Sequence, residues 1–370
     1  MSTSRQSRNP EIASEPTSVD IVRFAGVLVL AAAFAVGIWA AAGVARTDIA
    51  VWMLTLVASP EGFWAFLLVA TTPVGFGVLL LLQAESMRDT RTVPAIADWG
   101  QAAGFGVVAA GVAGGIWAAT AAFYDAFWAF LVVATVPLGV GTTVVLKAVS
   151  LQKDFQAAAL KGLGLAIGLI VIAAAFAIGV WVSSNVGQGL FVFGLPIDVH
   201  EQGALVFFMF ASWPAGVGLL VFVMTAELYN RTCQIEASSF GLVVGLALAF
   251  LGVVLALWLP LTVSQDGYVP RDVAVFLGLN AGLYPFAIGL AVGGASVSLR
   301  RPGNDAAKLA WLGTIAVFVV TSAVAGEAGI GYDEGFFWVF LSIALVPVAV
   351  AFTLAASAET CRLPQRQRDA

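Results

Sequence analysis

Residues that could do chemistry are scarce in this chain of 370 residues. His200 is its single histidine, which leaves too few ligands for haem or for a multi-histidine metal site. Asp198, His200 and Glu201 could hold a cation together, but their polar segment is more typical of a solvated loop that caps the following helix. We therefore expect no metal site and no cofactor.

Two further residues are candidates for gating or coupling. Glu327 stands where other copies of a repeat described below carry tryptophan, and an ionisable residue in a membrane span indicates function by default. The surrounding AGEAGIGYDEG is also typical of an interfacial loop, in which Glu327 would only cap a helix. Asn280 falls within an apolar run, where an interhelical hydrogen bond is the alternative to a functional role.

The sequence motifs of common enzymes are absent. The chain has no GxxxxGK[ST], HExxH or GxSxG, and its glycines lie within apolar runs. Its basic residues form no cluster of the kind that binds nucleic acid. We expect no catalytic residues, no enzymatic activity and no nucleic-acid partner.

The composition indicates a membrane protein. Hydrophobic residues make up 60% of the chain and charged residues 11%, and the mean hydropathy is +0.96. Soluble domains carry about a quarter charged residues, whereas runs of about 20 apolar residues can cross the bilayer as helices. Such runs recur from Ile21 to Ala358, so the predicted fold is an all-α integral membrane protein.

A proline in the middle of an apolar run recurs along the chain. FWAFLLVATTPVGFG at 63–77 returns as FWAFLVVATVPLGVG at 127–141. The aligned prolines are Pro73, Pro137, Pro214, Pro285 and Pro347. Small residues follow two and four positions later, namely Gly75, Gly77, Gly139, Gly141, Gly216, Gly218, Ala287, Gly289, Ala349 and Ala351.

These prolines and glycines allow two interpretations. Proline removes a backbone hydrogen bond and kinks a helix, so the five prolines are candidate hinges along a transport path. Alternatively, the small residues only let a neighbouring helix approach where the backbone bends. The glycines among them are therefore predicted helix-packing positions.

A second pattern lies between the proline-containing runs. It places a small residue two positions before tryptophan, at Gly37, Gly115, Gly179 and Ala256. Another glycine precedes each by eleven residues, at Gly26, Gly104, Gly168 and Gly245. Eleven residues make about three helical turns, so both small residues share one helix face.

Together the two patterns predict ten transmembrane helices in five tandem two-helix hairpins. The expected spans are 21–43, 63–84, 100–123, 126–149, 160–184, 203–228, 239–262, 272–297, 308–328 and 335–358. The corresponding organisation is a disordered tail at 1–18, hairpins at 19–97, 98–157, 158–236, 237–304 and 305–361, and a second tail at 362–370, all in one membrane domain.

Charge predicts the orientation of the hairpins. Of the 17 basic residues, all but Arg46 and Arg271 lie in the tails or between hairpins, whereas the hairpin tips are acidic. Basic residues stay on the cytoplasmic side, so we expect a multi-pass protein of the cell membrane with both termini cytoplasmic. The sequence pI of 4.9 and the scarcity of lysine are compatible with a halophilic host.

Two functions remain open. A transporter or permease-like protein fits ten spans with kinked helices, and the near absence of charge in the spans favours a small neutral or apolar cargo. The alternative is a non-catalytic subunit or scaffold of a larger membrane complex. The expected partners are membrane lipid and either further copies of the chain or other membrane subunits.

Overall fold

The computed structural model describes thirteen segments of the chain. They are residues 16–45, 60–87, 94–122, 125–151, 158–185, 191–192, 195–196, 203–226, 228–229, 231–263, 271–299, 304–330 and 336–362. Their helices are α1 Pro16–Ala45, α3 Pro60–Ser86, α4 Pro94–Ala122, α5 Ala126–Ser150, α6 Ala158–Asn185, α7 Gly203–Ala226, α8 Arg231–Val263, α9 Arg271–Ser298, α10 Asn304–Ile330 and α11 Phe336–Arg362. A two-residue antiparallel pair, β1 Phe191–Val192 and β2 Leu195–Pro196, lies between α6 and α7.

The described helices are those of a polytopic membrane protein. Nine of them are long and apolar enough to cross a bilayer, and α10 contributes a shorter apolar stretch, Ala310–Gly326, among its described residues. The helices α1, α4, α6, α8 and α10 each expose a large aromatic side chain as well. These are Phe24, Phe105, Phe176, Phe250 and Phe318. Apolar faces of this kind are suited to contact with lipid.

The helix ends differ from the predicted spans mainly by being longer. Three helices begin with proline, at Pro16, Pro60 and Pro94, where the missing N–H has no intrahelical acceptor to lose. Helix α10 continues to Ile330, two residues beyond the predicted 328, so AGEAGIGYDEG is helical up to Ile330 and the loop interpretation is wrong for that part. Alanine and glutamate are good helix formers and extend α10 through these residues. The prediction also missed the β1–β2 pair.

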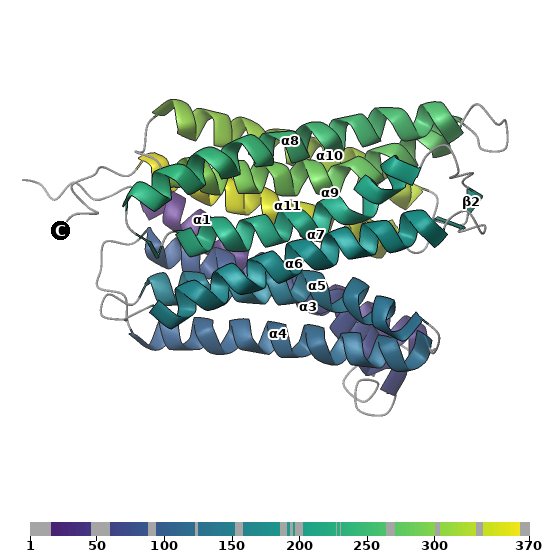
Figure 1. The fold of residues 1–370 in the computed structure, drawn as a ribbon, viewed down its shortest axis with the longest axis horizontal. Helices are drawn as coiled ribbons and strands as arrows, with labels where there is room; N and C mark the ends of the chain where they lie inside the picture. The colour runs from purple at the N-terminus through teal and green to yellow at the C-terminus, as the bar shows by residue number, and fades with distance from the viewer. Residues whose placement is uncertain are drawn as a thin grey trace, which may run out of the picture.

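Consecutive helices form antiparallel hairpins, with α1 on α3, α4 on α5, α6 on α7, α8 on α9 and α10 on α11. Gly26 near the start of α1 lies against Leu81 late in α3, whereas Gly37 lies against Phe66 early in α3. The small residues of the first helix therefore receive side chains of the second. Figure 1 shows the helices running alongside one another.

The second helices of the hairpins form a closed inner ring. Helix α3 contacts α5, α5 contacts α7, α7 contacts α9, α9 contacts α11, and α11 returns to α3. The first helices, α1, α4, α6, α8 and α10, lie outside this ring, each also touching the inner helix of the preceding hairpin. The same rule joins α1 to α11, so the first and last helices pack together where the ring closes.

The glycines after the prolines lie at two different contacts. Two residues after the proline, a Cβ on Gly75, Gly139 or Gly216 would meet Val140, Val217 or Ile288 of the next inner helix. Four residues after it, a Cβ on Gly77, Gly141, Gly218 or Gly289 would meet Leu30, Val108, Ile172 or Ala249 of the outer helix in the same hairpin. The first set therefore packs around the ring and the second packs within hairpins.

The fourth hairpin reverses the contact between a small residue of the outer helix and a large residue of the inner helix. In three other hairpins, glycine of the outer helix lies beneath phenylalanine of the inner helix, as Gly37 does beneath Phe66. In the fourth, the outer helix carries Ala256 and the inner helix carries Gly278, whose added Cβ would meet the Ala256 carbonyl oxygen and Pro260. Here the larger residue of the pair, alanine, is on the outer helix and glycine is on the inner helix, so the two backbones still approach closely.

Tryptophan pairs join neighbouring hairpins near the hairpin tips. Trp64 stacks on Trp117 with ring centroids 5.7 Å apart, and Trp128 stacks on Trp181 at 5.3 Å. Trp39 of α1 stacks on Trp338 of α11 at 5.9 Å. The seam between the first and last hairpins is thus built like two of the others.

Candidate functional site

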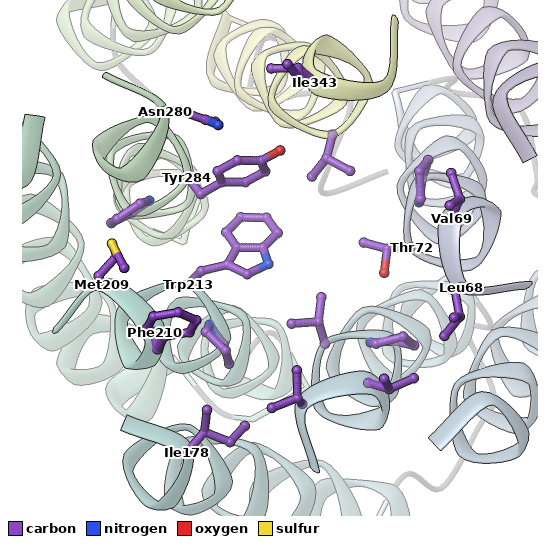
Figure 2. A pocket seen from close by; sticks show the side chains of 18 of the residues that line it. Leu68, Val69, Thr72, Ile178, Met209, Phe210, Trp213, Asn280, Tyr284 and Ile343 are labelled. Carbon is purple, nitrogen blue, oxygen red and sulfur yellow. The ribbon is translucent and has the colours of Figure 1, made fainter. Parts of the chain in front are cut away.

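A cavity of about 720 Å³ lies inside the ring of inner helices. It is lined by residues of α3, α5, α7, α9 and α11, together with Ile178 of α6. Cavities of this size commonly hold drug-sized molecules. Figure 2 shows it from close by, with side chains of several helices directed into the same space.

The lining follows the proline register of the sequence. Four of the five prolines, Pro73, Pro137, Pro214 and Pro285, line the cavity. The other inner-helix lining residues stand five, four and one positions before the aligned proline. They are Leu68, Val132, Met209, Asn280 and Ser342; Val69, Val133, Phe210, Ala281 and Ile343; and Thr72, Val136, Trp213, Tyr284 and Val346. Each inner helix therefore presents the same face, two turns long, to the cavity.

The lining is apolar apart from a few neutral polar groups. None of the lining residues that the structure describes carries a charge. Ser342 donates its hydroxyl to the Trp338 carbonyl oxygen at 2.7 Å. Figure 2 shows the Tyr284 hydroxyl and the Trp213 indole directed into the cavity, with Thr72 across from them on α3. Such a lining suits a neutral molecule because an unpaired charge would lose its hydration there.

Two aromatic rings form one wall of the cavity. Trp213 of α7 and Tyr284 of α9 meet edge to face, with ring centroids 5.5 Å apart and planes at 69°. This arrangement is favourable for aromatic pairs and fixes both ring planes. Asn280 stands one helical turn before Tyr284 on the same face of α9.

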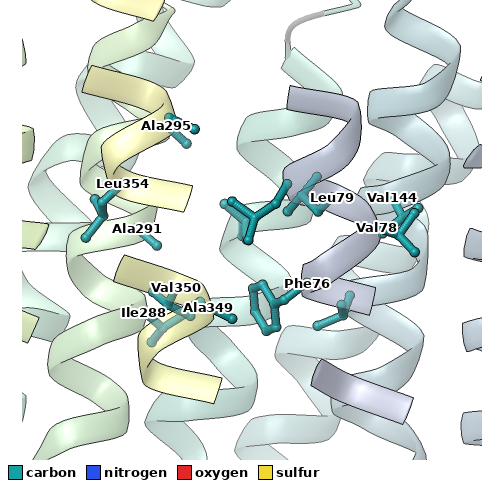
Figure 3. Close-up of a cluster of buried hydrophobic side chains, with 14 of the residues drawn as sticks. Phe76, Val78, Leu79, Val144, Ile288, Ala291, Ala295, Ala349, Val350 and Leu354 are labelled. Atoms are coloured by element: carbon teal, nitrogen blue, oxygen red, sulfur yellow. The ribbon is translucent and has the colours of Figure 1, made fainter. Parts of the chain in front are cut away.

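The ring is closed on the far side of the prolines. Three residues after each proline, Phe76, Val140, Val217, Ile288 and Val350 are at most 1% exposed. Seven residues after it, the side chains are at most 2% exposed: Leu80, Val144, Val221, Val292 and Leu354. Figure 3 shows Phe76 directed toward Ala349 and Val350 of α11, with Ile288 close to them. The cavity thus occupies the half of the ring nearest the hairpin tips, and a dry core fills the other half.

The predicted functional residues fall in different places. Asn280 and four of the prolines line the cavity, and Pro347 lies inside α11 next to the lining residue Val346. Glu327 belongs to α10, but its side chain lies outside the described residues, as do Asp198, His200 and Glu201 entirely. Sequence reasoning missed Trp213, Tyr284 and Thr72 as cavity residues. All three stand directly before an aligned proline, a position that only the structure shows to face the cavity.

Comparison with protein families, with characterised proteins and with solved structures finds no match for this chain. The cavity and the ring around it are therefore the features that bear on function.

Proposed function

We propose that this chain is a multi-pass protein of the cell membrane that binds a small neutral, largely apolar molecule in its central cavity and lets it cross. The cavity on the ring axis is the observation that supports this most. All five inner helices line it with the same face, and none of its described lining residues is charged. A transport path between packed helices needs such a cavity, and this one lies at the level of the helix prolines. The proposal includes no catalysis.

The proposed orientation sets the direction in which the cavity faces. The basic loops and tails support cytoplasmic termini, and α1 begins at the end of the bundle where α11 finishes, since Trp39 late in α1 stacks on Trp338 early in α11. With this orientation the cavity lies in the outer half of the membrane. The dry core closes the cytoplasmic half.

The test is to fill the cavity without changing the lipid-facing surface. Val136 lines the cavity, whereas Val243 of α8 is 67% exposed on the outer surface. We expect Val136→Trp to reduce the osmotic swelling of proteoliposomes in butane-1,2-diol to the rate of protein-free liposomes. Val243→Trp should swell like the unmodified protein.

A role as a subunit or scaffold predicts another result. In that case the unmodified protein would not accelerate swelling with any neutral solute, and gentle purification from native membranes would recover stoichiometric protein partners. Equal swelling of the Val136→Trp and Val243→Trp proteins would also contradict a path through the cavity.

A further inference from the structure

Three of the five polar lining residues of the cavity lie on two neighbouring helices. Helices α7 and α9 contribute Trp213, Asn280 and Tyr284, whereas α5 contributes only valines and a proline. The remaining polar lining residues are Thr72 of α3 and Ser342 of α11, and the hydroxyl of Ser342 is engaged within its own helix. A bound molecule would therefore find aliphatic surface on one side and an aromatic, polar surface on the other.

Asn280 supplies a buried hydrogen-bond acceptor with no use inside the protein. Asn280 lines the cavity, but its Oδ1 is buried against the protein and has no hydrogen-bond partner among the described residues. Leaving such an atom unpaired is unfavourable, and native structures rarely keep one without a reason. Three other side-chain oxygens share this state, on Gln83, Ser212 and Thr321, but none of these residues lines the cavity.

The neighbours of Asn280 indicate what kind of molecule would supply the missing hydrogen bond to its Oδ1. Tyr284 is one turn away on the same helix face, and its ring meets Trp213 edge to face at 5.5 Å. Figure 2 shows Asn280 beside Tyr284 at the cavity wall. Flat, fixed aromatic surfaces favour a flat apolar ring in the ligand, and the amide oxygen favours one donor group on its edge.

We infer that the cavity binds a neutral molecule with an apolar ring system and a single hydroxyl or N–H group, and that the Asn280 amide turns about its side-chain bonds to accept a hydrogen bond from that group at Oδ1. The inference rests on the proposed function and adds the ligand class to it. A ligand with this chemistry satisfies the orphaned oxygen and leaves no buried polar atom of its own unpaired. A pure hydrocarbon would fill the space but leave Asn280 unsatisfied.

Calorimetric titration of the full chain in lipid nanodiscs tests this with two ligands of one shape. The probes are 2-naphthol, which carries one hydroxyl, and 2-methylnaphthalene, which carries a methyl group in its place. We expect roughly three- to tenfold tighter binding of 2-naphthol, because one neutral hydrogen bond contributes about 0.5–1.5 kcal/mol. In Asn280→Leu this preference should disappear while 2-methylnaphthalene still binds, which also shows that the variant is folded.

Two further variants make the test specific. Asn280→Ala should lose the preference as Asn280→Leu does. Thr321→Val removes another unpartnered buried oxygen, away from the cavity, and should retain the preference in full. Equal binding of the two probes by the unmodified protein, or an undiminished preference in both Asn280 variants, would overturn the inference while leaving the proposed function intact. Binding of neither probe by the folded protein would count against the proposed function itself.

Discussion

At the scale of single residues, Gly104 and Gly106 of α4 show that only some glycines of these helices lie at close helix contacts. An added Cβ on Gly104 would meet Val145 Cγ2 at 2.7 Å and the Gly141 carbonyl oxygen at 2.9 Å, whereas nothing lies within 4 Å of one on Gly106. The backbone oxygen cannot move aside without separating α4 from α5. Glycines two positions apart in one apolar helix thus have opposite environments.

We predict that Gly104→Leu destabilises the protein by about 1–3 kcal/mol, the usual cost of overpacking. Gly106→Leu should be neutral or slightly stabilising because leucine has the better helix propensity. Thermal unfolding of both variants in the same detergent provides the comparison. Matching unfolding midpoints for the two would show that close helix approach at Gly104 is not required.

The sequence allowed some of these residue roles to be predicted and concealed others. The spacing of small residues from proline predicts helix-packing glycines, because a missing side chain is conspicuous in an apolar run. Trp213 and Tyr284 left no such mark, since aromatic residues also occur at lipid-facing and interfacial positions. Asn280 was visible as a polar exception, but only its place beside the cavity separates a ligand group from an interhelical hydrogen bond.

At the scale of the elements, proline occurs in the interior of both inner and outer helices. Pro137 of α5 lines the cavity, whereas Pro260 belongs to the outer helix α8. We predict that Pro137→Ala lowers solute-driven swelling of proteoliposomes several-fold without loss of thermal stability, because the restored backbone hydrogen bond straightens and stiffens α5. Pro260→Ala should keep the original swelling rate. Unchanged swelling in Pro137→Ala would favour simple packing as the role of this proline.

The elements themselves were the most predictable part of the fold. Length, apolarity and internal proline were enough to locate the helices, although α8 begins at Arg231, ahead of the predicted 239. Which face of each helix lies toward the axis was not predictable. Lipid and protein core are equally apolar, so the usual contrast between a buried and an exposed face is missing from these sequences.

At the scale of the whole molecule, transport through the ring requires its dry half to open. Val144 of α5 lies in that half and is fully buried, whereas Val136 lines the cavity. In a chain with Cys233→Ser and Cys361→Ser, we predict that Val136→Cys reacts with a membrane-impermeant maleimide from the side of the hairpin tips. Val144→Cys should react more slowly, and only from the opposite side.

The control for this experiment is Val243→Cys, whose side chain faces outward from α8 and should not react from either side in the bilayer. If Val144→Cys stays inert under conditions in which solute crosses the membrane, the path does not follow the ring axis. Closure of the ring was itself beyond sequence reasoning, because tandem hairpins can equally stack in a row.

The contact between α1 and α11 has a consequence for the order of the hairpins in the sequence. That seam carries the same tryptophan stack as the seams between α3 and α4 and between α5 and α6, so packing does not distinguish the place where the polypeptide starts. Circular permutation could therefore change the order of the hairpins without changing how they pack. A chain cut between the second and third hairpins, with its former ends joined by a linker, would form the same inner ring and the same cavity.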